Sequence, residues 1–197
     1  MPNKPTVVRT NSTPGSIKVV ELKVLTFQEL WDNYPPGDPY DDPTGQYKSQ
    51  CAIRMSVAFH RVGIAMLSFS QKLVKPAPRR KDVGRLLLDG KPTATRAYEL
   101  AEWLQLRPIA GLQKAENVTG PDWVSKVEGR TGILFFYGYW QQDGDSTDDL
   151  SGGHIDLWNG EKLTGIGTGL RVHWNIVISG IWSDFRKSKT ILFFPIR

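Results

Sequence analysis

The first half of the chain carries its hydrophobic residues at helical spacing. Thr26 followed by Glu29 is a capping box, which predicts a helix that ends before Pro35. A longer helix is expected to begin after Ser49, which can cap it, and to end near Gly63. Its residues are apolar around most of the helix circumference, and this pattern is typical of a helix buried in a core.

The second half changes from helical spacing to strand-like patterns. After a third predicted helix over residues 95–106, residues 132–139 form an aromatic, β-prone run. Residues 154–158 alternate between polar and apolar, and residues 191–196 form a last apolar strand. Because helices come first and strands follow, we predict an α+β fold in which N-terminal helices pack on a C-terminal antiparallel sheet.

The N-terminal segment differs from the rest in composition. Residues 1–18 are polar and rich in Pro, Thr and Asn, so we expect a flexible tail before one domain that spans residues 19–197. The chain has no run of the roughly 20 apolar residues that a membrane span needs, and its N-terminus lacks the apolar segment of a signal peptide. We therefore expect a protein that is made in the cytoplasm without a signal peptide and does not insert into a membrane.

Charge and composition narrow the chemistry further. The net charge of +5 favours anionic partners, but the basic residues are spread along the chain, with their densest cluster at 75–85, so no nucleic acid partner is expected. One cysteine and three histidines offer no zinc-ligand spacing, and no glycine-rich phosphate loop is present. We therefore expect neither a metal nor a cofactor.

Cys51 is the candidate nucleophile. With Ser49 as the cap, it lies in the first turn of a mostly buried helix, where free N–H groups and the helix dipole favour a thiolate. The turn-rich segment 33–46 precedes it and would leave the sulfur open to a cleft. From this position alone, a buried structural thiol is an equally good interpretation.

A thiolate nucleophile needs a base, and imidazole is the usual one. His60 lies on the same predicted helix as Cys51 but roughly 13 Å away along the axis, so it cannot reach the sulfur. His173 is flanked by apolar residues and is expected to be a packed or exposed neutral histidine. His154 opens an alternating strand after two glycines, which makes it the candidate base.

The strand that follows His154 supplies a candidate partner for the imidazole. Successive strand residues point to opposite faces, so His154, Asp156 and Trp158 share one face while Ile155 and Leu157 point to the core. Asp156 would then orient the imidazole or contact substrate. Taken alone, a His-x-Asp strand on the protein surface is the competing interpretation.

Two segments resemble the signature blocks of a known family, the family 4 amidase effectors of type VI secretion. They are residues 50–55, which read Gln-Cys-Ala-Ile-Arg-Met, and residues 153–160, which read Gly-His-Ile-Asp-Leu-Trp-Asn-Gly. Supporting blocks follow in the same order as in the family, and they are residues 27–35, 96–104, 132–144 and 183–185.

The resemblance implies a papain-like fold of the NlpC type, with Cys51 on a helix and His154 on the sheet. It implies hydrolysis of the amide between D-glutamate and meso-diaminopimelate in peptidoglycan peptide stems, by an antibacterial toxin that the type VI secretion apparatus delivers into the periplasm of a target cell. It also implies a cognate immunity protein that blocks the cleft. Gln50, Tyr47 and Trp158 are the residues we expect to contact the substrate.

One position departs from the family. The third catalytic residue of these effectors is expected as an aspartate just beyond a Leu-Thr pair on the strand after the histidine. Here Leu163 and Thr164 are followed by Gly165, which cannot hold an imidazole. Asp156, Thr164 or another group takes this role, or the protein works with Cys51 and His154 alone.

The sequence leaves a second function class open. Seven tryptophans are enough to build a non-catalytic module that binds cell wall or glycan by stacking its aromatic rings on sugars. In such a module the meeting of a cysteine and a histidine would be accidental.

Overall fold

The computed structural model describes residues 4–9, 13–140, 152–164 and 185–197. The helices are α1 (Phe27–Asp32), α2 (Cys51–Arg61), α3 (Ala97–Gln105), α4 (Trp123–Val127) and a single 3-10 turn, η1 (Phe185–Lys187). The strands are β1 (Lys4–Arg9), β2 (Ile17–Leu22), β3 (Arg85–Leu88), β4 (Lys91–Ala94), β5 (Glu116–Asn117), β6 (Gly132–Tyr137), β7 (Gly153–Trp158) and β8 (Thr190–Pro195).

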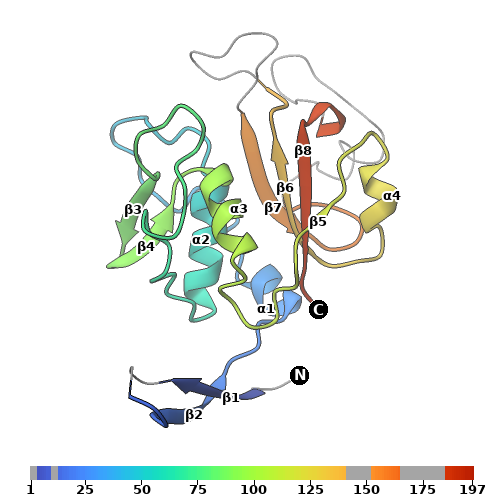
Figure 1. The fold of residues 1–197 in the computed structure, drawn as a ribbon. Coiled ribbons are helices and arrows are strands. Elements are labelled where there is room, and N and C mark those ends of the chain that lie inside the picture. Colours follow the sequence, from blue (N-terminus) through green and yellow to red (C-terminus); the bar gives the residue numbers. More distant parts are fainter. Residues whose placement is uncertain (1–3, 10–12, 141–151, 165–184) are drawn as a thin grey trace.

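A four-stranded antiparallel sheet lies at the centre of the fold (Figure 1). Its strand order is β5–β8–β6–β7, and β6 pairs with β7 and β8 along its whole length. The hairpins β1–β2 and β3–β4 lie outside this sheet. The predicted combination of helices with an antiparallel sheet is confirmed, although α4 falls between β5 and β6 in the chain.

Helices cover both faces of the sheet, with α2 and α3 on one side and α4 on the other (Figure 1). In β6, Ile133 and Phe135 join the core under α1, α2 and α3, while Leu134 and Phe136 join a second core with α4. This alternation follows from strand geometry, because successive side chains point to opposite faces. A strand buried on both faces reads as a continuous apolar run, as residues 132–137 do.

Local capping decides where the first two helices begin. The predicted capping box of α1 is confirmed, since Thr26 Oγ1 accepts the N–H of Glu29 at 3.3 Å and Glu29 Oε2 accepts the N–H of Thr26 at 3.1 Å. In α2 the prediction is wrong by one residue: the N-cap is Gln50, not Ser49, and no side chain caps the helix. Cys51 is therefore the first residue of α2.

A buried serine fixes α2 to β4. Ser56 has no exposed surface, and its hydroxyl donates to the carbonyl of Ala52 at 2.8 Å and accepts the N–H of Ala94 at 3.1 Å. The bond to Ala94 satisfies a backbone donor that would otherwise be buried without an acceptor. The helix that carries Cys51 is thereby held by polar contacts as well as by apolar packing.

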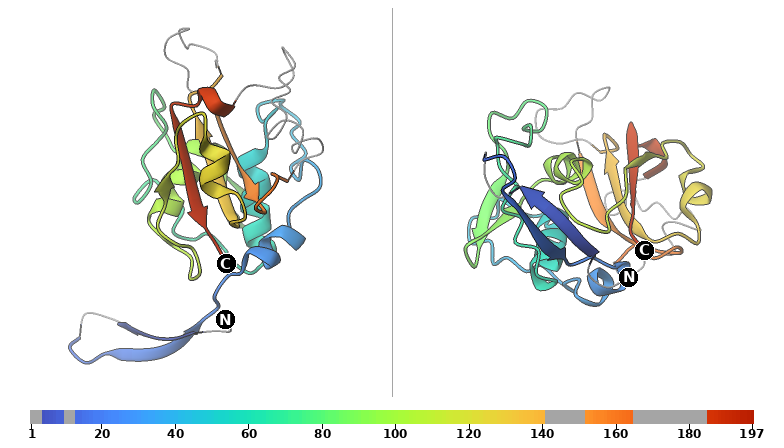
Figure 2. Two further views of the ribbon diagram at one scale, coloured as in Figure 1. Left: turned by 90° about the vertical axis from the view of Figure 1, so that its right-hand side faces the viewer. Right: turned by 60° about the horizontal axis from the view of Figure 1, so that its bottom comes forward.

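The N-terminal segment differs from the expected flexible tail. Lys4–Arg9 pairs antiparallel with Ile17–Leu22, so part of the segment 1–18 forms a hairpin. The hairpin projects away from the helices and the central sheet (Figure 2). Among the helices in the described ranges, none is long and apolar enough to cross a membrane.

Ser56→Ala is expected to lower the free energy of unfolding by about 1–3 kcal/mol, because it leaves the buried N–H of Ala94 unpaired. Urea denaturation followed by tryptophan fluorescence measures the change. Ser125→Ala is the matched control, because its exposed hydroxyl donates only to the nearby carbonyl of Asp122; its effect should stay within about 0.5 kcal/mol. Equal losses in the two variants would contradict the role assigned to Ser56.

Candidate active site

Cys51 is the only cysteine of the chain, and it is 4 % exposed at the start of α2. Its sulfur is hydrogen-bonded to the ring of His154 and to the backbone N–H of Ile155. The hydroxyl of Ser49 lies 3.9 Å from the sulfur. Because no side chain caps α2, its first backbone N–H groups remain available to a negative charge at this point.

His154 meets this sulfur from the edge of the sheet. It lies near the start of β7, the last strand in the order of the central sheet, so its ring can reach beyond the sheet to the start of α2. The ring lies nearly parallel to the rings of Phe136 and Phe185, at centroid distances of 6.5 and 5.6 Å, and these two phenylalanines stack on each other at 4.0 Å. These aromatic neighbours hold the plane of the imidazole, while 20 % of the side chain stays exposed.

Each member of the pair shifts the pKa of the other. Burial raises the pKa of the Cys51 thiol, but the hydrogen bond and charge of His154, together with the N–H of Ile155, bring this pKa below its ordinary value. Burial acts to lower the pKa of His154, but hydrogen bonds to Asp156 and Cys51 raise it to about 9. The lowered pKa of the thiol favours the thiolate, which is the nucleophilic form of cysteine, and the raised pKa of His154 favours the imidazolium.

Asp156 lies on the other side of the imidazole. Its Oδ2 is 3.5 Å from Nε2 of His154, which leaves Nδ1 of the ring for the sulfur. Its Oδ1 accepts the backbone N–H of Leu157 at 2.8 Å and the hydroxyl of Thr164. The two residues considered for the third catalytic position are therefore arranged in series, with Asp156 next to the ring and Thr164 behind it. Gly165 lies outside the described residues.

Tyr34 extends this series, and the sequence did not point to it. Burial and the charge of Asp156 raise the pKa of Tyr34 well above its ordinary value, against the opposing effects of a hydrogen bond to Thr164 and the charge of Arg54. The phenol therefore stays protonated. Tyr34 thus lies within hydrogen-bonding reach of Thr164, which itself donates to Asp156.

Two of the three residues expected to contact substrate have structural roles instead. The side-chain amide of Gln50 accepts the N–H of Tyr40 at 3.1 Å and donates to its carbonyl at 2.8 Å, so it holds the loop before α2. Trp158 has no exposed surface, and its indole N–H donates to the carbonyl of Val127 at 3.0 Å. Trp158 is thus a core residue, and its predicted contact with substrate is wrong.

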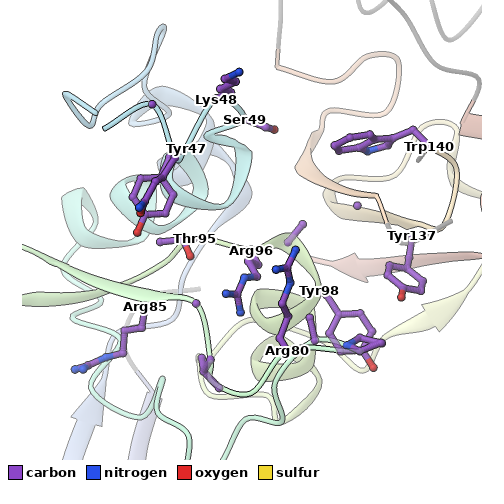
Figure 3. A pocket seen from close by; sticks show the side chains of 18 residues that line it. Tyr47, Lys48, Ser49, Arg80, Arg85, Thr95, Arg96, Tyr98, Tyr137 and Trp140 are labelled. Atoms are coloured by element: carbon purple, nitrogen blue, oxygen red, sulfur yellow. The ribbon is translucent and has the colours of Figure 1, made fainter. Parts of the chain in front are cut away.

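The third expected residue, Tyr47, lines a groove of about 800 Å³ whose described lining includes neither Cys51 nor His154 (Figure 3). Ser49 and Gly153 also line the groove, and each lies close in the chain to one member of the pair. A groove of this size is typical of small-molecule and peptide sites. Gly152 allows the close approach of Trp140 at the rim, since a Cβ there would lie 2.4 Å from the indole.

A thiol at the start of a helix, an imidazole on the neighbouring strand and a carboxylate beyond it form the arrangement of a nucleophile with its base, in an α+β protein with a groove alongside. The chain belongs to the family of type VI secretion system amidase effector protein 4, whose model matches residues 47–194. The family indicated by the two signature blocks is thereby confirmed.

Solved structures share this fold. The type VI effector Tae4 from Enterobacter cloacae has a TM-score of 0.50 and 17 % sequence identity, with 87 % of this chain and 95 % of that chain covered. The Tae4 from Salmonella typhimurium, in complex with the immunity protein Tai4 from Enterobacter cloacae, has the same TM-score of 0.50 and 17 % identity, with 87 % and 98 % covered. No curated protein sequence matches the chain significantly.

Alkylation of Cys51 by iodoacetamide tests the ionic pair. In the wild type the pKa of the thiol is lowered, so the midpoint of the pH–rate curve should lie below that of an ordinary cysteine. In His154→Ala burial acts without its counterion, so the midpoint of the pH–rate curve should move upward. His60→Gln serves as the control and should follow the wild type. An unchanged midpoint in His154→Ala would show that the ring does not ionise the thiol.

Asp156→Asn should lower the pKa of His154 from about 9, because the ring loses a negatively charged partner. Thr164→Ala keeps the carboxylate and should change this pKa less. Titration of the ring protons by NMR measures both shifts. If Thr164→Ala changed the pKa of His154 more than Asp156→Asn does, Asp156 would not be the main partner of the imidazole.

Proposed function

We propose that this protein is a cysteine-dependent peptidoglycan amidase of the papain-like NlpC type, which cleaves the bond between D-glutamate and meso-diaminopimelate in peptide stems. The observation that carries the proposal is the hydrogen-bonded pair of Cys51 and His154 beside a groove, in a chain that belongs to a family of amidase effectors.

The first half of the reaction forms an acyl-enzyme. The Cys51 thiolate attacks the carbonyl carbon of the stem amide, a C–S bond forms, and the carbonyl electrons move to oxygen. The uncapped start of α2 offers backbone N–H groups to this oxyanion. When the intermediate collapses, the C–N bond breaks and the leaving amine takes a proton from the imidazolium of His154.

The second half releases the acid. His154, now neutral, accepts a proton from water as the water oxygen attacks the thioester carbon. The C–S bond breaks, and the thiolate and imidazolium are restored. Asp156 supports both halves, because a carboxylate at Nε2 holds Nδ1 toward the sulfur and stabilises the charged ring.

The proposal includes a route and an inhibitor. We propose that the type VI secretion apparatus delivers the protein to the periplasm of a target cell, where it acts as an antibacterial toxin. A cognate immunity protein would occupy the groove; solved structures with this fold include Tae4 in complex with the immunity protein Tai4.

A non-catalytic glycan-binding module has less support. Stacking on sugars needs exposed aromatic faces. Trp103, Trp123 and Trp158 are almost completely buried, and Trp103 and Trp158 donate their indole protons within the chain. The described tryptophans therefore serve the core more than the surface.

Digestion of purified peptidoglycan, with the fragments identified by mass spectrometry, tests the function. The wild type should release fragments cut between D-glutamate and meso-diaminopimelate, and Cys51→Ala should release none because it lacks the nucleophile. Ser125→Ala, an exposed change far along the chain from either signature block, should cut as the wild type does. Equal digestion by Cys51→Ala would remove the assigned nucleophile, and fragments cut at another bond would correct the substrate.

A further inference from the structure

Positive charge lines the groove that includes Ser49 and Gly153, the residues near Cys51 and His154 in the chain. Lys48, Arg80, Arg85 and Arg96 contribute to its lining, and none of the described lining residues is Asp or Glu. Within the described chain, Lys48 and Arg80 have neither an ion pair nor a side-chain hydrogen bond. Among the described residues Arg96 is paired with Glu99, but Lys48 and Arg80 are not paired, and positive charge of this kind in a groove attracts anionic ligands.

Two of the arginines present their side chains to the groove. Figure 3 shows the side chain of Arg80 extending toward the space below Ser49 and Trp140, whereas Arg85 points away from it, and Arg96 is part of the lining. Arg80 comes from the loop before β3, and Arg96 precedes α3. Two segments of the chain thus bring their guanidinium groups into one groove.

A buried carboxylate holds both segments in place. Glu99 of α3 has no exposed surface, and its Oε1 accepts the Nη1–H of Arg96 at 2.8 Å and the backbone N–H of Ala77 at 2.9 Å. Its Oε2 accepts the backbone N–H of Gly84 at 2.6 Å. The loop that carries Arg80 is therefore tied at both ends to the carboxylate that orients Arg96.

Arg96 keeps donors for a ligand. Within the described chain, its partners are Glu99 and the carbonyl of Asp82, and Nη1 makes both contacts. The remaining guanidinium N–H groups lie on the side chain that lines the groove. Gly84 leaves room for this side chain, since a Cβ there would lie 2.9 Å from Cγ and 3.0 Å from Nε of Arg96.

We propose that Arg80 and Arg96 form a subsite that binds a free carboxylate of the peptide stem and so sets the specificity of the hydrolysis; this rests on the proposed function. Guanidinium groups match a carboxylate in plane and in spacing, and they remain charged at every physiological pH. Peptide stems carry carboxylates next to the proposed scissile amide. Tyr98 and Tyr137 line the same groove and pack at 5.2 Å between centroids, which gives the subsite an aromatic wall.

The test compares synthetic peptide stems in which all carboxylates are free with stems in which one carboxylate at a time is an amide. Arg80→Gln should raise KM for the free stem about ten- to a hundredfold with little change in kcat, since a charge-assisted hydrogen bond is lost. When the carboxylate that Arg80 binds has been converted to an amide, Arg80→Gln and the wild type should have the same KM for that stem. Lys81→Gln, an exposed neighbour outside the groove lining with the same change in charge, is the matched control.

Two outcomes overturn the subsite while leaving the enzyme intact. In the first, Arg80→Gln has the same KM as Lys81→Gln on every stem. In the second, Arg80→Gln raises KM by the same factor on every amidated stem. Calorimetry with Cys51→Ala and with Cys51→Ala/Arg80→Gln repeats the comparison for binding alone. If stems bind in an Arg80-dependent way but the wild type does not cut them, the subsite is supported and the proposed function is wrong.

Discussion

The contact between a buried thiol and an imidazole sets the main constraint on this structure. Burial disfavours the charged form of Cys51 and of His154, and each group offsets that effect in the other because the two are within hydrogen-bonding reach. The two come from the start of a helix and the edge of a sheet, so the pair exists only while α2 and β7 keep their relative position. Ser56, which joins α2 to β4, and the apolar side chains of Ile155 and Leu157 in the core beneath the helices maintain that position.

The register of the sheet is the second part of the same constraint. β6 pairs Phe136 with His154 and Gly132 with Trp158, and a slip by one residue would send His154 to the other face. Trp158 opposes such a slip, because its indole is fully buried against Trp123 and donates to the backbone near α4. Trp158, which does not contact Cys51, thus fixes the face of the sheet on which His154 lies.

The difference between Trp158 and His154 also shows what sequence patterns can and cannot predict. Strand alternation correctly put the two on one face, but alternation does not reveal what covers that face, and α4 buries the tryptophan while leaving the histidine near the edge. The capping box of α1 and the apolar run of β6 were predicted correctly, because each depends on residues that are close in the sequence. Two features could not be predicted from the local sequence because they depend on the assembled fold. They are the position of Tyr34 next to Thr164 and the pairing of β3 with β4.

Asp156 places a carboxylate next to the ring of His154 from a different position in the chain than the family pattern predicts. Where the family pattern leads one to expect an acid after the Leu-Thr pair, this sequence has Gly165, while Thr164 donates its hydroxyl to Asp156. Asp156 follows His154 by two residues on the same strand, so strand geometry alone brings its carboxylate to the side of the ring. A carboxylate next to the histidine on one strand needs an additional group to fix its rotamer, and Thr164, backed by the protonated Tyr34, provides it. The proposed mechanism therefore requires a negative charge next to Nε2. The chain can supply this charge from β7 when the segment after β7 provides a hydroxyl in place of an acid.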